Sequence, residues 1–280
     1  MVVFLLWVVN MKETLFEILR SRLFLGALAI VLLVGCYHSL SARQHVKNPD
    51  DTTIPTASQL AHGIGRIIGE DRNTGQRWIL VDSKATLTRL FLGLGIGVFC
   101  SVVLGVCMGC FRIVERFFSP PLLLLSKVPP TAMLAVFFVM AGTGMEMYLA
   151  MIGFGTLPTL AQTIFLAVKD VPRENIDKAR TLGASTCEVV WDVIFKQILP
   201  RIIDNIRMQI GPSMVYLIAA EMVCGDVGFG YRIRTQSRLL NMNVVYPYLV
   251  LLGCFGFGMD WVLRCAMRRM CRWYTAGAGR

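Results

Sequence analysis

Long apolar stretches separated by short polar ones dominate the sequence. Several of them approach the roughly 20 residues that an α-helix needs to cross a hydrocarbon core about 30 Å thick. They cover residues 23–42, 90–111, 117–141, 147–168, 208–223 and 244–263. This pattern predicts an all-α, polytopic membrane protein with about six transmembrane helices.

Prolines and glycines mark special positions within these stretches. Lys127 and the Pro129-Pro130 pair interrupt the third span, so we expect a broken helix there, of the kind that lines a cavity or a protein interface. The second span carries glycines at four-residue spacing, which lets another helix approach its backbone closely. These glycines are Gly93 with Gly97 and Gly105 with Gly109.

The distribution of lysine and arginine predicts which connections face the cytoplasm. Lys12 and Arg20 precede the first span, the largest basic loop joins the fourth span to the fifth, and a group of arginines follows the sixth. Under the positive-inside rule both termini are therefore cytoplasmic. Arg232, Arg234 and Arg238 are the exception, because this topology places them outside.

These features divide the chain into four parts. Residues 1–42 form an N-terminal cytoplasmic segment with the first transmembrane helix, and 43–84 form an extracytoplasmic segment. Residues 85–273 form a core of five transmembrane helices with a cytoplasmic loop at about 169–204, and 274–280 form a cytoplasmic tail. The extracytoplasmic segment contains an amphipathic stretch suited to a membrane surface. Its apolar residues are Leu60, Ile64, Ile67 and Ile68.

Composition agrees with a membrane protein. Hydrophobic residues make up 55% of the chain and charged residues only 16%, against about 25% charged in soluble domains. The net charge is +10, but the cations flank apolar runs and are not interleaved with aromatic residues, as a nucleic-acid groove would require. Five of the cysteines lie in apolar runs or at their ends, namely Cys100, Cys107, Cys110, Cys254 and Cys265. Cys107-x-x-Cys110 lacks a second Cys or His pair for a metal site.

Two alternatives concern the N-terminal region. Leu33-Val34-Gly35-Cys36 resembles a lipoprotein cleavage box, although we favour a retained anchor. Met11 is an alternative start to Met1, because the apolar residues 1–10 are too few to cross a membrane. The histidines lie in the outer segment or at the outer end of the first span, which argues against a histidine-based metal site deep in the membrane.

The basic loop predicts two short helices. The first covers residues 172–182, with Ile176, Ala179 and Leu182 on one face, and Gly183 ends it. Ser185-x-x-Glu188 is a capping box that begins a second helix, which we expect to end near Pro200. Two helices that meet at a glycine form a lever suited to a soluble partner, and a merely solvated amphipathic loop is the alternative.

The stretch from Asp177 to Ser185, together with Ile198-Leu199-Pro200, resembles the EAA loop of binding-protein-dependent ABC permeases. In that family the loop forms a coupling helix that docks into a cleft of the ATPase subunit and transmits its closure to the spans. The resemblance implies a coupling role for Glu174, Asp177, Lys178, Ala179, Arg180, Gly183, Ala184, Ser185 and Pro200.

The resemblance extends over residues 84–273 and points to the branch that transports nitrate, sulfonates, taurine or bicarbonate. It rests on Val128–Ala132, Gly142-x-Gly144, Pro158, Ala219–Met222 and Gly228–Tyr231. It implies that the translocation pathway involves Pro129, Pro130, Pro158, Glu221, Gly228 and Gly230.

Several positions depart from the family pattern. Asp177 and Lys178 stand at the first two EAA positions, and Asp204 stands where a second proline is expected. Lys127 and Ala135 replace the outer prolines of the third-span motif. These departures affect the docking contacts and the choice of solute more than the type of subunit.

Two carboxylates are expected at membrane depth, where such groups are functional candidates. Asp260 has Arg264 one helical turn further on, which predicts an ion pair. Glu221 either pairs with Arg232 or Arg234 at a helix end or acts in transport, although its charge would repel an anionic solute.

The chain contains no Gly-Lys dipeptide and therefore no GxxxxGK[ST] loop to bind nucleotide phosphates. We therefore expect no catalytic residue, no metal site and no cofactor on this chain, with ATP and Mg²⁺ bound by a partner ATPase. The expected partners are two ATPase copies, an extracytoplasmic solute-binding protein and a second permease copy. That copy would make a homodimer, and a homologous partner would make a heterodimer.

The expected function is that of the transmembrane permease subunit of an ATP-driven importer in a bacterial inner membrane. Its solute would be a small oxyanion or sulfonate-like compound, with nitrate, a sulfonate, taurine, bicarbonate and an organic heterocycle all open. The alternative is an ATP-independent secondary transporter or channel, which would show inverted repeats or ionisable groups in mid-span.

Overall fold

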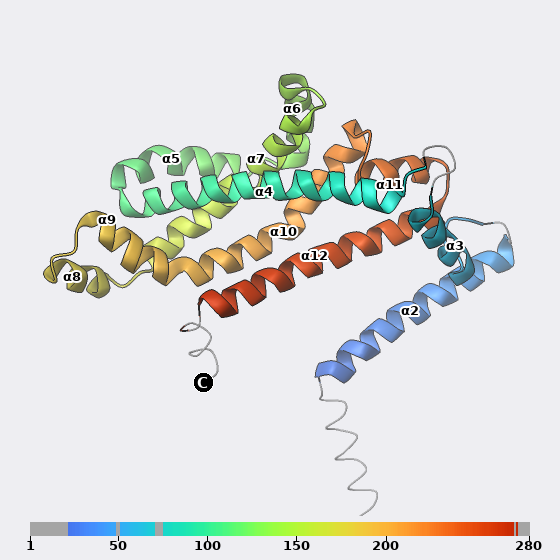
Figure 1. Cartoon of the computed structure of the whole chain (residues 1–280), viewed down its shortest axis with the longest axis horizontal. Coiled ribbons are helices and arrows are strands. Elements are labelled where there is room, and N and C mark those ends of the chain that lie inside the picture. Colours follow the sequence, from blue (N-terminus) through green and yellow to red (C-terminus); the bar gives the residue numbers. More distant parts are fainter. Residues whose placement is uncertain (1–21, 49–50, 71–74, 272, 274–280) are drawn as a thin grey trace, which may run out of the picture.

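The computed structural model describes residues 22–48, 51–70, 75–271 and 273, and this part of the chain is almost entirely helical (Figure 1). Its first elements are α2 (Arg22–Lys47), α3 (Ala57–Ile68), α4 (Trp78–Cys110), α5 (Arg112–Leu125), the 3₁₀ turn η1 (Pro130–Met133) and α6 (Leu134–Ala141). They are followed by α7 (Met145–Lys169), α8 (Arg173–Thr181), α9 (Thr186–Glu188), the π-helical turn η2 (Val189–Phe195), α10 (Lys196–Cys224), α11 (Phe229–Arg238) and α12 (Met242–Met270). The predicted all-α class is confirmed for these residues.

Four of the described helices are long and apolar enough to cross a membrane, namely α2 over Leu25–Val46, α4, α7 and α12. Two bent helix pairs also qualify. α5 with the segment η1 to α6 bends by 85°, and the helix Thr186–Cys224 with α11 bends by 54°. Counting each bent pair as one span gives up to six spans, which agrees with the predicted number.

The third span breaks where the sequence places Pro129 and Pro130. Pro130 begins the 3₁₀ turn, because proline lacks the N–H that a helix interior needs but is accepted in a first turn. The bend turns α6 out of line with α5, so that it projects from the body while Phe137 still packs against Phe154 of α7 (Figure 1). The predicted break is confirmed, although the helix before it begins at Arg112 rather than at Phe117.

Glycines bring α4 and α7 together. A Cβ atom added at Gly93 would lie 2.7 Å from Cδ1 of Ile152, and one added at Gly105 would lie 2.7 Å from the carbonyl oxygen of Ala161. Such distances are too short for real contacts, so the glycines are what allow this spacing. Both predicted glycine pairs therefore face α7, since added atoms at Gly97 and Gly109 would meet side chains of the same helix.

α4 begins at Trp78, well before the apolar run that starts at Leu90. Its first three turns therefore carry polar and charged side chains that the sequence placed in the outer segment or at its edge. Asp82 and Thr86 on this part of the helix are buried. The second span is longer than predicted, and its added turns supply much of the polar site described below.

The second helix of the basic loop does not end near Pro200. α9, η2 and α10 form one continuous helix from Thr186 to Cys224 that passes through Pro200 and Pro212. The prediction failed because a proline removes one backbone hydrogen bond, and buried packing against neighbouring helices compensates for that loss. Pro200 is itself buried, between the buried residues Ile198 and Ile202.

The segment between α2 and α4 packs against α12. The amphipathic helix α3 buries Ile67 in a cluster with Val244 and Tyr248 of α12, and Gly63 lies directly against the backbone of α12. α2 extends away from the other helices (Figure 1), and its described side chains are mostly exposed. It is attached near its end, where the Tyr37 hydroxyl donates to the carbonyl oxygen of Pro55 at 2.7 Å.

The predictions for Lys12, Arg20, the start at Met1 or Met11 and the tail 274–280 lie outside the described residues. Cys36 lies on α2 with an exposed side chain. This placement leaves the alternatives of a cleavage box and a retained anchor as predictions.

We predict that Gly105→Ala destabilises the protein by about 1–3 kcal/mol, because the added methyl group meets the backbone of α7 and forces the two helices apart. The midpoint of thermal unfolding of the purified protein in detergent measures this effect. Gly95→Ala is the matched control, since the same helix has nothing within 4 Å of an atom added there. Equal unfolding midpoints for the two variants would show that the helix contact does not depend on Gly105.

Candidate functional site

The basic loop between α7 and α10 forms a compact turn around Gly183. Gly183 has a φ of +88°, a conformation that favours glycine. Its N–H donates to the carbonyl oxygen of Arg180 at 2.9 Å, and the N–H of Ala184 donates to that of Ala179 at 3.1 Å. The predicted stop of the first loop helix at Gly183 is confirmed.

The predicted capping box of the second loop helix is also present. The Ser185 hydroxyl accepts the N–H of Glu188 at 3.4 Å, and the Glu188 carboxylate accepts the N–H of Ser185 at 2.8 Å. This reciprocal pair satisfies backbone donors that would otherwise lack partners at the start of α9. The connection between the two loop helices therefore consists of the turn at Gly183 and the capping box at Ser185, and both form from residues close together in the sequence.

The helix α8 has a packed face and an exposed face. Ile176 and Ala179 pack against a cluster that includes Val189 and Ile194 of η2. Leu182, which we expected on the same apolar face, is instead 88% exposed, because it follows the last helical residue and lies in the turn before Gly183.

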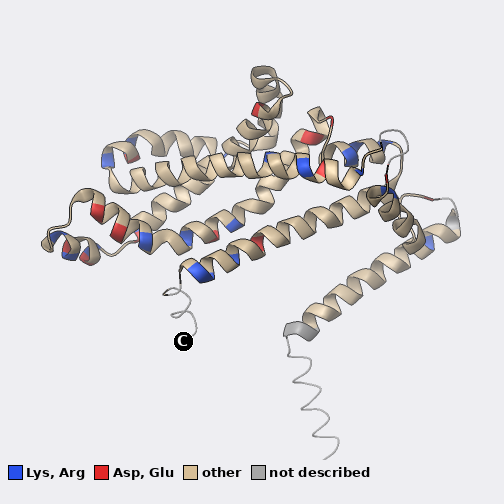
Figure 2. Ribbon diagram, in the orientation of Figure 1, with Lys and Arg blue, Asp and Glu red and all other residues tan. Residues whose placement is uncertain are grey.

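Most of the predicted coupling residues lie on the exposed side of this loop. Charged residues are spread over α8 and the helix that follows it (Figure 2). The exposed residues are Glu174, Asp177, Lys178, Arg180, Gly183 and Ser185, whereas Ala179 and Ala184 are half-buried. Pro200 is buried within α10, so it contributes to the helix rather than to this surface.

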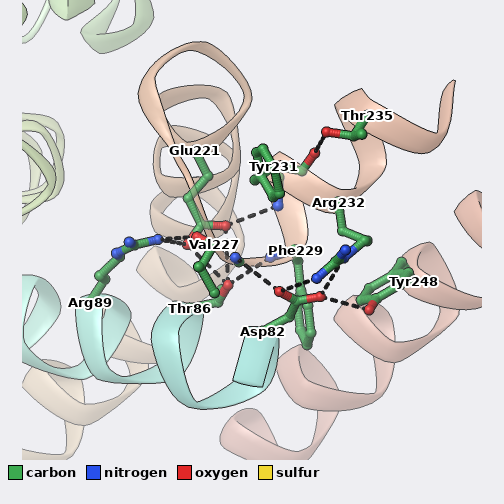
Figure 3. A network of polar contacts seen from close by, with 12 residues as sticks. Asp82, Thr86, Arg89, Glu221, Val227, Phe229, Tyr231, Arg232, Thr235 and Tyr248 are labelled. Atoms are coloured by element: carbon green, nitrogen blue, oxygen red, sulfur yellow. Dashed lines mark hydrogen bonds and ion pairs between the residues drawn. The ribbon is translucent and has the colours of Figure 1, made fainter. Parts of the chain in front are cut away.

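A second polar site lies at the end of the molecule opposite the basic loop, where α4, α10, α11 and α12 meet (Figure 3). The Glu221 side chain is fully buried, and its Oε1 accepts Nη1 of Arg89 at 2.8 Å. The Thr86 hydroxyl lies 3.0 Å from each carboxylate oxygen, and the N–H of Gly230 donates to Oε2 at 2.9 Å. The predicted pairing with Arg232 or Arg234 is wrong, because α4 extends far enough to supply Arg89 from another helix.

Asp82 is the second fully buried carboxylate of this site. Arg232 donates to it from Nε at 2.9 Å, and the Tyr248 hydroxyl donates at 2.7 Å. The N–H of Gly228 donates at 3.2 Å (Figure 3). Arg234 instead donates to backbone carbonyl oxygens at the end of α10. Arg232 and Arg234, which conflicted with the positive-inside rule, thus bind a carboxylate and backbone carbonyl oxygens of the same protein.

Two glycines let the chain fold tightly around Glu221. Gly228 has a φ of +125°, and an added Cβ would lie 2.6 Å from the Glu221 carboxyl carbon. A Cβ at Gly230 would lie 2.5 Å from the carbonyl oxygen of Ile218. Between them, the N–H of Phe229 donates to the Thr86 hydroxyl at 2.9 Å. Larger residues at either glycine would displace the carboxylate.

The structure brings together three of the predicted pathway residues, namely Glu221, Gly228 and Gly230. The other three take no part in this hydrogen-bond network. Pro129 and Pro130 form the break in the third span, where Pro130 packs near Gly155 of α7. Pro158 is buried within α7.

Four members of this site are not among the residues predicted from the sequence, namely Asp82, Thr86, Arg89 and Tyr248. The spacing of the first three was a usable signal, because residues at i, i+4 and i+7 share one face of a helix. Such a polar face at the start of an apolar run indicates that the helix begins before the run does.

A third ionic cluster joins α10 to α12. Asp260 accepts Nη2 of Arg264 at 2.7 Å, which confirms that predicted pair. It also accepts Nε of Arg207 at 2.8 Å, and Arg207 in turn pairs with Asp204 at 2.6 Å. Asp204, which stands where the family pattern expects a proline, is therefore part of an ion-pair network. Among the described residues, no group of three His, Cys, Asp or Glu side chains is placed to hold a metal ion.

We predict that Arg89→Leu destabilises the protein by about 3–5 kcal/mol, because it leaves the Glu221 carboxylate buried without its cation. The double variant Arg89→Leu/Glu221→Gln should unfold at a higher temperature than the single variant, since the stranded charge is gone. Thermal unfolding of the purified protein measures both effects.

Arg116→Leu is the matched control, because Arg116 is exposed and forms no ion pair among the described residues. Additive effects of Arg89→Leu and Glu221→Gln would contradict a direct pairing of the two side chains.

Comparisons with known proteins converge on one family. A family model described as "Binding-protein-dependent transport system inner membrane component" matches residues 94–272. The taurine transport system permease protein TauC of Escherichia coli is 29% identical over 190 residues, which cover 68% of this chain and 69% of TauC. The nitrate import permease protein NrtB of Synechocystis is 23% identical over 192 residues, covering 69% of this chain and 68% of NrtB.

Two further similarities concern the extent of the match and the fold. A probable ABC transporter permease protein of Brucella melitensis is 25% identical over 249 residues, which cover 89% of this chain and 96% of that protein. A chain from a structure of the MetNI methionine ABC transporter in inward facing conformations superposes with a TM-score of 0.57 at 20% identity. It covers 69% of this chain and 94% of the MetNI chain.

Proposed function

Because this chain belongs to the family of binding-protein-dependent transport system inner membrane components, we propose that it forms the membrane pathway of an ATP-driven importer for a small oxyanion or sulfonate. Relatives named as permeases for taurine, aliphatic sulfonates and nitrate support this solute class. The main structural support for ATP-driven coupling is that α8 has one exposed face and packs with its other face against the start of the long helix Thr186–Cys224.

In this proposal the exposed face of α8 is the docking surface for an ATPase subunit. Leu182 offers an apolar contact, and Asp177, Lys178 and Arg180 beside it offer charged ones. ATP and Mg²⁺ bind to the ATPase, since this chain has no GxxxxGK[ST] loop. The complex contains two ATPase copies, a second permease copy of the same sequence and a separate solute-binding protein.

A movement of α8 can be transmitted to the opposite end of the protein through one continuous helix. Ile176 and Ala179 pack against η2, and η2 continues without a break into α10. α10 ends at Cys224, one turn beyond Glu221. Closure of the ATPase pair thus tilts a helix whose far end is hydrogen-bonded to α4 and α11, and this tilt opens the pathway outward.

An anionic solute is compatible with the buried carboxylates. Glu221 pairs with Arg89 and Asp82 pairs with Arg232, so each carboxylate has a cation within 3 Å. The charge of Glu221, which would repel an anion if it were alone, is therefore balanced locally. The balance removes this objection to an anionic solute, and the solute class itself rests on the relatives' names.

We assign the α8 end of the chain to the cytoplasm of a bacterial inner membrane. The last turn of α12, with Arg268 and Arg269, points toward the same end of the molecule as α8 (Figure 1). The basic loop and the C-terminal arginines thus share one side, in agreement with the positive-inside rule. We assign the N-terminus to this side as well, because Lys12 and Arg20 precede the first span.

We predict that Leu182→Asp abolishes ATPase binding, because it places an unpaired charge at the centre of the docking surface. The measurement is a pull-down of the tagged chain from gently solubilised membranes, with mass spectrometry of the co-purified proteins. The wild-type chain should recover an ATPase with a GxxxxGK[ST] loop. Leu239→Asp is the control, since Leu239 is 63% exposed but lies at the end of the molecule opposite α8. An unchanged ATPase yield from Leu182→Asp would remove α8 as the docking surface.

We predict that Gly183→Ala reduces ATP-driven uptake several-fold, because an alanine at a φ of +88° costs about 1–2 kcal/mol and distorts the turn. Gly183→Asn should retain more activity, since asparagine accepts this backbone conformation better. Uptake into proteoliposomes that contain the whole importer measures both variants. An added Cβ at Gly183 meets no atom within 4 Å, so the substitution changes the backbone preference without causing a steric clash. Full uptake by Gly183→Ala would therefore show that transport does not need the positive φ at this position.

The solute class is tested with the purified importer and its binding protein. We expect taurine, an alkanesulfonate or nitrate to stimulate ATP hydrolysis by the complex, and methionine to have no effect. Stimulation by methionine alone would contradict the proposed solute class but would leave the importer function intact.

A further inference from the structure

A pocket of about 240 Å³ lies beside the coupling loop, between the α4–α5 turn, the end of α7 and the helices α8 and η2. One part of its wall is apolar, formed by Val168, Val171, Ile176, Val189, Val190 and Ile194. The other part carries four cations, namely Arg112, Lys169, Arg173 and Arg180. No acidic side chain lines the pocket.

The positive charge of this pocket is largely uncompensated. Lys169 pairs with Glu115, with 2.7 Å between Nζ and Oε2. Among the described residues, Arg112, Arg173 and Arg180 form no ion pair. Arg112 and Arg173 are also the first residues of α5 and α8, where the helix dipoles add positive potential.

Surface cations that only satisfy the positive-inside rule need no pocket and can pair with nearby carboxylates. Several cations near this end of the molecule do so, with Lys196 paired to Asp192 and Arg201 paired to Asp170. By contrast, the pocket gathers cations from three separate segments around one concave apolar wall. This combination suits a ligand that carries both a phosphate and an apolar part.

The pocket lies at the level where two spans end. α4 ends at Cys110 and α7 ends at Lys169, and both residues line the pocket. Phe111 and Ile113 beside it are 49% and 85% exposed, as expected for side chains that face lipid. Phospholipid headgroups occupy this level of a bilayer, and basic pockets between helices at the cytoplasmic side bind anionic ones.

We propose that this pocket binds the phosphate headgroup of an anionic phospholipid. The guanidinium groups of Arg112 and Arg173 hold the phosphate, and the glycerol and upper acyl chain cover the apolar wall. Because α8 and η2 form one side of the pocket, the bound lipid ties the coupling loop to the ends of α4 and α7. The proposal rests on the assignment of the α8 end to the cytoplasm made above, but it does not depend on the identity of the solute.

The test is equilibrium binding of fluorescent phosphatidylglycerol and phosphatidylcholine to the purified full-length protein in detergent. Phosphatidylglycerol should bind at least tenfold more tightly, as an order-of-magnitude expectation. Arg112→Gln/Arg173→Gln should weaken it about twentyfold, since each cation near a lipid headgroup contributes about fivefold. Arg112→Lys/Arg173→Lys should retain most of the affinity, which separates loss of charge from loss of folding.

Arg268→Gln/Arg269→Gln is the matched control, because it removes the same charge from the last turn of α12, outside the pocket. An equal loss of phosphatidylglycerol binding in this control would overturn the proposal in favour of general surface charge. Displacement of the lipid by an equal concentration of glycerol phosphate would also overturn it, since the pocket would then bind a free anion rather than a lipid.

Discussion

The ion pairs of two fully buried carboxylates hold together the end of this protein that lies opposite α8. Glu221 on α10 pairs with Arg89 on α4, and Asp82 on α4 pairs with Arg232 on α11. A charge buried among apolar helices is costly unless it has a counter-ion and hydrogen-bond donors. Each helix supplies a group that another helix needs, and the glycines of the α10–α11 connection let backbone N–H groups complete both sites. The bend between α10 and α11 is therefore fixed by electrostatics as well as by packing.

The buried ion pair of Glu221 anchors one end of the long helix Thr186–Cys224, which connects the two ends of the molecule. Its first turns pack against α8, and its last turns carry Glu221 into the buried ion pair. A second network, in which Arg207 contacts Asp204 and Asp260, attaches it to α12 between these two ends. The helix thus has specific polar attachments at two levels and an apolar one at the loop. Such a chain of contacts is what allows a displacement at one end to reach the other.

Local features of this fold could be predicted from the sequence, whereas distant pairings could not. The break at Pro129, the turn at Gly183 and the cap at Ser185 each depend on a few neighbouring residues and a known backbone preference. The partner of Glu221 depends on how two helices pack, and Arg89 lies 132 positions away in sequence.

Hydropathy alone also set the start of α4 too late, because the polar turns that carry Asp82 are buried by other segments rather than by lipid. The same dependence on packing explains why the helix continues through Pro200. At a rise of about 1.5 Å per residue, the continuous helix Thr186–Cys224 extends for roughly 55 Å, almost twice the thickness of a hydrocarbon core. Much of it must stand outside the lipid, and the angle at which it leaves the bilayer is tied to the thickness of that bilayer. The acyl-chain length of the surrounding lipids therefore affects this protein, because a thicker membrane holds the helix more upright and shifts the position of the basic loop between α7 and α10.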